Sequence, residues 1–384
     1  MKRLLFVALL GVFCIGCSDK STSLNNQQNP TETPDVNDDA SLFVCDGDEL
    51  YAFPCDGGET MVVVASDVEY DIVISEEAQE WLTVGCTRSD LCIDRHSFIV
   101  ASNFGGRFRS AQVEFVDKEN VILHTIRFVQ ASEDGIIRYT TTDGNVLTPS
   151  SAQFETFGAM LVANTYRDGE GVLVFDDDIT QIGDCAFADC ATLATITLPD
   201  SITAIGEKTF MGCVALGDIT IPNSVTSIGS VSFYRCFGLQ NVTIPDSVTD
   251  LGLSAFMGCI NLKSVTIGNG VSIIPDSAFK RCYSLEDVTI PTNIREIHAE
   301  AFSECTSLVS ITIPESVVCL LQWVFDGCTS LESVYCRSSY PPTGSGDPFG
   351  NNANNRKIYV PRESVDRYVS WWEEYAEDIV GYDF

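Results

Sequence analysis

The stretch Ser254-Ala-Phe-Met-Gly-Cys-Ile-Asn-Leu-Lys-Ser-Val-Thr-Ile267 belongs to a phrase of 23 residues that repeats without insertion or deletion from about residue 173 to 336. Three of its slots recur at every step, namely Phe187, Phe210, Phe233, Phe256, Phe279, Phe302 and Phe325, then Cys190, Cys213, Cys236, Cys259, Cys282, Cys305 and Cys328, then Leu193, Leu216, Leu239, Leu262, Leu285, Leu308 and Leu331. A fixed period of this length is typical of stacked repeats, in which each unit buries its apolar face against the next. The sequence therefore predicts a mainly β solenoid with parallel strands.

Each coil is expected to contain one short strand. Val265 and Ile267 alternate with Ser264 and Thr266, which is the pattern of a half-buried strand. The outward threonine recurs as a ladder at Thr197, Thr220, Thr243, Thr266, Thr289 and Thr312. A second apolar pair follows the strand, as at Val225 and Ile228. In the first four coils a glycine comes after this pair and is expected to allow a turn. The segment 255–259 is expected to form a short helical turn with its Phe and Cys inward.

The phrase closely resembles the BspA-like leucine-rich repeats. The residues that carry the resemblance are Ile-Pro-x-Ser-Val-Thr-x-Ile-Gly at 221–229, Ala-Phe-x-x-Cys at 255–259 and Leu-x-x-Val-Thr-Ile at 262–267. We therefore expect a leucine-rich-repeat solenoid over residues 173–340. The resemblance implies a role in adhesion to host proteins or to other bacteria, and it names no ligand.

Seven of the 16 cysteines occupy one slot of the repeat. Identical slots on stacked coils point the same way, which suits disulfide geometry poorly. Free cysteine is among the most buried residue types. We expect a ladder of reduced, buried thiols, with disulfides or a metal site as the alternatives.

Residues 1–17 have the pattern of an export signal, with Lys2 and Arg3 before an apolar run that is too short to span a bilayer. Gly16 before Cys17 resembles the lipobox of bacterial lipoproteins, which implies a lipid anchor on Cys17. We expect an outer-membrane lipoprotein that faces the cell exterior, on a flexible tether of residues 18–40. The alternatives are simple secretion and a periplasmic orientation.

Residues 41–131 contain several short apolar runs separated by turn signals, which predicts an immunoglobulin-like β-sandwich. The stretch resembles the BACON domain of Bacteroidetes surface proteins in Gly57-Gly58-Glu-Thr, Trp81-Leu-Thr-Val, Val100-Ala-Ser-Asn, Arg109-Ser-Ala-Gln-Val and Val129-Gln130. That resemblance implies either carbohydrate binding or a spacer. We expect Trp81 to be a core residue, with a sugar platform as the alternative. One or two disulfides are possible among Cys45, Cys55, Cys86 and Cys92, and the sequence does not indicate their pairing.

Both ends of a solenoid need a cap that keeps the open core from water. We assign the N-terminal cap to residues 132–172 and the C-terminal cap to residues 341–384. Residues 363–376 place Val365, Tyr368, Val369, Trp372 and Tyr375 near one face of an expected helix. The alternative use of the pair Trp371 and Trp372 is a sugar-binding platform.

Binding specificity is expected at slots that vary where the rest of the phrase repeats. The slots after Phe and after Cys place an apolar and aromatic row on the middle coils, consisting of Met211, Tyr234, Phe237, Met257, Ile260 and Tyr283. We call this set the ridge. An exposed row of this kind usually marks an interaction site. The alternative is that these side chains fold down and seal the edge of the core.

The formal net charge is -32, with 22 Lys and Arg against 54 Asp and Glu. Such a chain repels phosphate backbones, so we expect no nucleic-acid partner. The three histidines are isolated and no catalytic or cofactor motif is present, so we expect no enzyme, no metal and no cofactor. The expected partner is a protein at the cell surface, bound by a monomer. The alternatives are a glycan ligand, bound by the sandwich or the Trp-rich cap, and an enzyme built on the solenoid.

Overall fold

The computed structural model describes residues 42–44, 50–54, 57–66, 69–87, 93–103, 106–149, 154–344 and 346–384. Its contacts divide the chain into two compact units, which we describe separately: residues up to 104 together with 109–130, and residues 105–108 together with 131–384. Outside the described residues lie the predicted lipid anchor Cys17, the tether 18–40, Cys45, Cys55 and Cys92, and also the side chain of Cys86. No helix in the described ranges is long and apolar enough to cross a membrane.

The first unit contains two four-stranded sheets. One sheet has the order β1 (Leu42–Val44), β3 (Gly58–Ser66), β6 (Ile93–Val100), β5 (Leu82–Thr87). The other has the order β2 (Leu50–Phe53), β8 (Ile122–Gln130), β7 (Arg109–Val116), β4 (Asp71–Ile74), and a 3₁₀ turn, η2 (Glu76–Ala78), precedes β5. The pair β2 and β8 is parallel. The other strand pairs of the two sheets are antiparallel.

The two sheets of the first unit enclose one core. Along β7, Ala111, Val113 and Phe115 are buried and alternate with more exposed neighbours, as expected for a strand with one buried face. Val62 of β3 and Phe128 of β8 belong to the same apolar cluster. This arrangement is a β-sandwich, and its assignment as an immunoglobulin-like or BACON-like domain stays a prediction.

The second unit begins with an antiparallel sheet in the order β10 (Leu161–Arg167), β11 (Glu170–Phe175), β9 (Ile136–Thr141), β13 (Leu193–Thr197). A 3₁₀ turn, η3 (Glu133–Gly135), precedes β9, and one helical turn, α1 (Phe154–Phe157), precedes β10. Strand β13 is the first strand of the repeat. Because β9 pairs with β13, the open edge of the first coil has a hydrogen-bonded partner.

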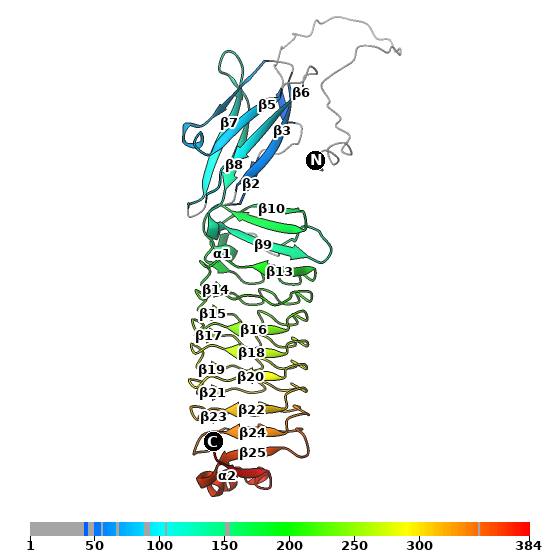
Figure 1. The fold of residues 1–384 in the computed structure, drawn as a ribbon, viewed down its shortest axis with the longest axis vertical. Coiled ribbons are helices and arrows are strands. Elements are labelled where there is room, and N and C mark those ends of the chain that lie inside the picture. Colours follow the sequence, from blue (N-terminus) through cyan, green and yellow to red (C-terminus); the bar gives the residue numbers. More distant parts are fainter. Residues whose placement is uncertain are drawn as a thin grey trace, which may run out of the picture. The chain divides into compact units, whose positions relative to one another are not determined.

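Beyond β13 the chain winds into a parallel β-solenoid of about 9 turns, seen as successive rungs in Figure 1. One ladder consists of β16 (Asn241–Ile244), β18 (Ser264–Ile267) and β20 (Asp287–Thr289), followed by β22 (Ser310–Ile313), β24 (Ser333–Cys336), β25 (Lys357–Pro361) and β26 (Ile379–Tyr382). A second ladder, on another side of each coil, consists of β12 (Gln181–Ile182), β14 (Ala204–Ile205), β15 (Ser227–Ile228) and β17 (Asp250–Leu251), followed by β19 (Ile273–Ile274), β21 (Glu296–Ile297) and β23 (Cys319–Leu320). The mainly β solenoid with parallel strands is thus confirmed. The second ladder lies where the sequence indicated only an apolar pair before a turn.

The repeated slots build the core. Val265 and Ile267 are buried and Thr266 is exposed, as the alternation predicted. The Phe rings stack from Phe187 to Phe349 with neighbouring centroids 5.0–5.8 Å apart. The cysteines of the repeat are free thiols, and six of the seven are fully buried, the partly buried one being Cys190. The prediction of a reduced thiol ladder is confirmed.

The segment 255–259 differs from the expected helical turn. It forms successive tight turns, in which Met257 N–H donates to Ser254 O (3.1 Å) and Cys259 N–H donates to Phe256 O (3.3 Å). Ser254 and Gly258 have left-handed φ angles of 55° and 74°. A left-handed residue on each side of Phe256 interrupts a right-handed helix, so the chain reverses twice while the Phe stays inward.

The stack continues past the end of the sequence repeat. Strand β24 pairs with β25, and β25 pairs with β26, all in parallel. Phe349 extends the ring column one residue later than the period requires. The expected helix over 363–376 is shorter: it comprises η4 (Arg362–Ser364), α2 (Val365–Trp371) and η5 (Glu373–Tyr375). Trp372, with φ −115° and ψ 57°, ends α2.

Candidate functional site

The ridge lies on the tight turns that carry Phe and Cys inward. Tyr234 follows Phe233, and the next residue, Arg235, has a left-handed φ of 61°. Cys236 then returns to the core and Phe237 follows it. The turn therefore places two adjacent side chains at the edge of each coil, one after Phe and one after Cys.

Hydrogen bonds to the backbone carbonyl groups of ridge residues link neighbouring coils. In the slot after Phe, Gly212 N–H donates to Tyr234 O (2.8 Å) and Arg235 N–H donates to Met257 O (3.0 Å). In the slot after Cys, the Asn261 side-chain amide donates to Phe237 O (2.8 Å) and Ser284 N–H donates to Ile260 O (3.2 Å). The two slots thus form two columns that run across the coils.

The ridge side chains are partly exposed. Tyr283 is 40% exposed, and Met211, Tyr234, Phe237, Met257 and Ile260 are half-buried. They cover the edge of the core and still present part of their surface to solvent. This burial agrees with both interpretations of the ridge, so the assignment as a binding surface stays a prediction.

Two arginines lie beside the ridge, although the chain is strongly acidic. The guanidinium of Arg235 lies 5.1 Å from the centroid of the Tyr234 ring, and within the described part of the chain Arg235 makes no ion pair. Arg281 Nε donates to Glu304 Oε1 (3.1 Å), and this bond together with the charge of Glu304 raises the pKa of Arg281. The apolar and aromatic side chains of the ridge therefore lie beside cationic groups.

The outward strand face carries the threonine ladder and ends in an aromatic cluster. Tyr335 and Tyr359 take the outward slot on β24 and β25, with ring centroids 4.8 Å apart. The rings of Tyr382 and Phe384 pack edge-on against Tyr335. A break in the repeat could have revealed this cluster, because Tyr335 stands where the period places Thr.

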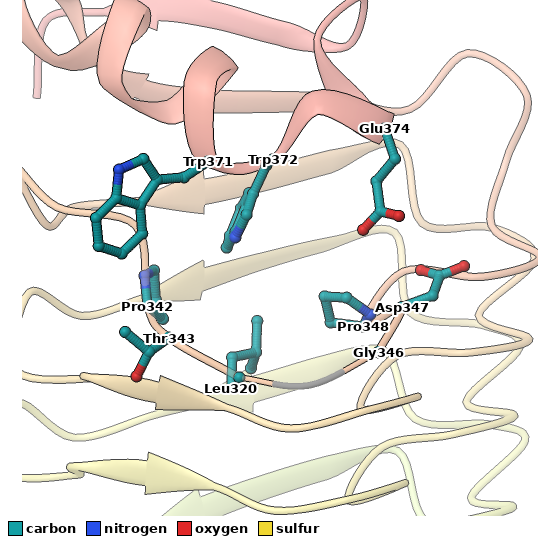
Figure 2. Close-up of a pocket in the computed structure, with 10 residues that line it drawn as sticks. Leu320, Pro342, Thr343, Gly346, Asp347, Pro348, Trp371, Trp372 and Glu374 are labelled. Carbon is teal, nitrogen blue, oxygen red and sulfur yellow. The ribbon is translucent and has the colours of Figure 1, made fainter.

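A cleft of about 460 Å³ lies in the C-terminal part of the second unit (Figure 2). We call it the Trp cleft, and it is lined by Leu320, Pro342, Thr343, Gly344, Gly346, Asp347, Pro348, Trp371, Trp372 and Glu374. Trp371 is 58% exposed, whereas Trp372 is partly buried against the core. Of the two tryptophans noted in the sequence, Trp371 therefore lies at the surface and Trp372 packs against the core.

Trp81 of the first unit is 7% exposed and belongs to the sandwich core, which confirms the packing interpretation. The guanidinium of Arg109 covers its ring at 4.5 Å.

Ser277 and Lys280 both bind Glu300, with Lys280 Nζ at 2.7 Å from Glu300 Oε1. The described residues contain no group of His, Cys, Asp and Glu that could hold a metal ion.

Comparison with known proteins gives one family match. The model described as the BspA type leucine rich repeat region matches residues 172–286 and 272–366 in 6 copies, which together span just over half of the chain. No curated protein matches the sequence.

Several solved structures are similar. A leucine-rich repeat protein from T. pallidum is 27% identical, and the match covers 40% of this chain and 72% of that one with a TM-score of 0.36. One from Eubacterium ventriosum is 25% identical, covering 41% of this chain and 42% of that one, with a TM-score of 0.37. A leucine-rich cell surface protein from Faecalibacterium prausnitzii is 21% identical, and the match covers 58% of this chain and 86% of that one with a TM-score of 0.33. The match thus spans less than half of the Eubacterium chain, and the family assignment rests on the repeat model.

Proposed function

The chain belongs to the BspA-type leucine-rich repeat family, and we propose that it is a non-enzymatic, adhesin-like protein of the cell surface that binds a protein ligand through the ridge of its solenoid. A lipid on Cys17 would hold it in the outer membrane. The cell-surface description of the F. prausnitzii relative applies to that protein and supports the same location here.

The observation that carries this proposal is the composition of the ridge on a regular scaffold. Binding hot spots are enriched in aromatic residues and Arg, and they lie where neighbouring contacts exclude water. Tyr234, Arg235 and Phe237 come from one coil and Tyr283 from the next coil but one. Met257 and Ile260 lie on the coil between them, so the aromatic groups flank an apolar centre.

Sealing of the core does not require this composition. The slot after Phe holds Lys280, Ser303 and Asp326 in the later coils, and the Phe and Cys of those coils are still buried. A coil therefore closes without an apolar side chain in this slot. The apolar residues of the middle coils are best explained by a partner that covers them.

The test is binding of the full-length mature chain to a panel of purified extracellular-matrix and serum proteins, measured by biolayer interferometry. We expect at least one member to bind, and the triple substitution Tyr234→Ala, Phe237→Ala, Tyr283→Ala to weaken that binding by at least tenfold, since hot-spot side chains contribute about 2 kcal/mol or more each. The matched control is Thr220→Ala, Thr243→Ala, Thr266→Ala on the strand face, which should bind like wild type.

Thermal unfolding of both triple variants separates lost binding from lost folding. Unchanged affinity in the ridge variant with a lower unfolding temperature would show that the ridge only seals the core. Loss of binding in the threonine variant instead would move the site to the strand face.

A further inference from the structure

The Trp cleft has one wall of indole and one wall of carboxylate. Figure 2 shows the rings of Trp371 and Trp372 on one side and the carboxylates of Asp347 and Glu374 on the other. The volume of about 460 Å³ is in the range of small-ligand sites. The cleft is therefore large enough for one side chain or one small ligand.

The two tryptophans differ in how they are held. The ring of Trp372 packs edge-to-face against Tyr368 (centroids 5.3 Å apart), Phe349 (5.7 Å) and Tyr375 (6.1 Å). Trp371 ends α2 and leaves 58% of its surface in solvent. Packing explains Trp372 and leaves the exposed indole of Trp371 unexplained, since an exposed Trp loses a large apolar contact area.

The carboxylates of Asp347 and Glu374 both affect Tyr375. Asp347 Oδ1 accepts a hydrogen bond from the Tyr375 hydroxyl and one from Phe349 N–H (2.9 Å). Burial raises the pKa of Tyr375, and the hydrogen bond and charge of Asp347 and the charge of Glu374 raise it further. Asp347 thus bonds directly to Tyr375, and both carboxylates line the cleft.

No cation of the described chain forms an ion pair with these two carboxylates, although the guanidinium of Arg356 lies 5.0 Å from the centroid of the Tyr375 ring. The lining residues include no Lys, Arg or His, and neither Asp347 nor Glu374 forms an ion pair within the described ranges. Two nearby arginines are engaged elsewhere. Arg356 binds Asp378 (2.6 Å), and Arg367 lies 4.0 Å from the centroid of the Tyr340 ring and donates to Ser339 O.

We propose that the Trp cleft binds the cationic side chain of an Arg or Lys on a protein partner. A guanidinium or ammonium group is attracted to the face of an indole, and more strongly to Trp than to other rings. Carboxylates accept short, charge-assisted hydrogen bonds from the same group. The net charge of -32 raises the local concentration of cationic partners. A neutral sugar can also stack on Trp371, but it leaves both carboxylates unneutralised. This site is separate from the ridge, and the proposal holds whether or not the ridge binds a protein.

The test uses the full-length chain and two peptides, acetyl-tri-arginine amide and the matched acetyl-tri-citrulline amide, which is similar in shape and neutral. We expect calorimetry in low-salt buffer to show binding of the arginine peptide and at least tenfold weaker binding of the citrulline peptide. Trp371→Ala and Glu374→Gln should each weaken binding of the arginine peptide at least threefold, as expected for the loss of one cation–π or one ion-pair contact. The matched control is Glu373→Gln, because Glu373 is an exposed carboxylate next to Glu374 that does not line the cleft.

Equal weakening by Glu373→Gln and Glu374→Gln would overturn the proposal, because the attraction would then come from overall charge. Equal binding of the two peptides would overturn it as well. Binding of cellohexaose or maltohexaose that depends on Trp371, without binding of the arginine peptide, would make the cleft a glycan site instead. Each of these results leaves the ridge assay unaffected, since no ridge residue lines the cleft.

Discussion

At the scale of single residues, each coil depends on two left-handed backbone positions beside its Phe. The first position holds Cys185, Lys208, Val231, Ser254, Ser277, Glu300 and Trp323, with φ between 55° and 60°. Non-glycine residues rarely adopt this conformation, and β-branched residues least of all. Val231, with φ 60°, is therefore the most strained member of the column.

We predict that Val231→Gly stabilises the protein by about 1 kcal/mol, since relief of left-handed strain outweighs the greater entropy of glycine in the unfolded chain. The matched control is Val309→Gly, because Val309 is exposed and has no left-handed φ. That control should lower stability. Urea unfolding measures both, and a Val231→Gly variant less stable than wild type would contradict the strain argument.

The cysteine of each coil bonds to the coil before it. The Cys259 thiol donates to Phe233 O at 3.1 Å, and the same bond recurs at five other coils. Burial raises the pKa of Cys259 to about 12, because the thiolate would lose its hydration. The thiol therefore stays protonated and donating at neutral pH.

This pKa shift predicts a pH dependence of stability. The folded-state value lies above the ordinary value of 9.0, so the stabilisation is complete below pH 9 and is lost as the pH rises toward 12. Between pH 8 and pH 10.5 the unfolding free energy of wild type should fall by about 1–2 kcal/mol more than that of Cys259→Ser, which lacks this titration. An equal fall in unfolding free energy in the two proteins would show that the Cys259 thiol ionises in the folded state over the same pH range as in the unfolded chain.

At the scale of the coil, glycines set how closely neighbouring turns approach. A Cβ on Gly229 would lie 2.4 Å from Gly206 C and 2.6 Å from Glu207 N, which are backbone atoms of the preceding coil. Gly229 has no left-handed φ, so close approach requires this glycine, and the expected conformational freedom is not the reason. In the first four coils, where the slot holds glycine, neighbouring backbones can approach this closely only while this space is kept.

We predict that Gly229→Ala destabilises the protein by about 1–3 kcal/mol, because rigid backbone must move to admit the methyl group. Gly217→Ala is the matched control. Its Cβ would meet only Ala194 O at 3.6 Å, so it should be neutral or slightly stabilising. Thermal unfolding compares the two, and a harmless Gly229→Ala would mean that the coils can separate locally.

The sequence predicted most of the coil and missed features that break its period. Inward and outward slots follow directly from the 23-residue repeat, and Phe256, Cys259, Val265 and Ile267 are buried as expected. The helical turn was wrong because left-handed angles at non-glycine residues have no sequence signature. A strand at 357–361 was expected as part of the cap, and β25 lies there. Its place as a further rung and the strand β26 were missed because one extra residue before Phe349 shifts the period, although the ring column continues.

At the scale of the whole molecule, the two candidate surfaces differ in how well sequence can reveal them. The ridge was found because its residues vary in slots that are otherwise regular. The Trp cleft was found only in part, since Trp371 and Trp372 were noticed and the carboxylates opposite them were not. Asp347 lies in a loop outside the period, and only the folded chain places it against the end of α2.

The central claim is that a protein ligand covers the ridge. Hydroxyl-radical footprinting tests it most directly, because Met, Tyr and Phe side chains react readily and five of the six ridge residues are of these types. With the full-length chain and the protein that binds it in the panel, we predict reduced oxidation of Met211, Tyr234, Phe237, Met257 and Tyr283. Tyr340 and Tyr382, which are 62% and 42% exposed, should stay as reactive as in the free chain. Unchanged oxidation of the ridge with protection elsewhere would contradict the account.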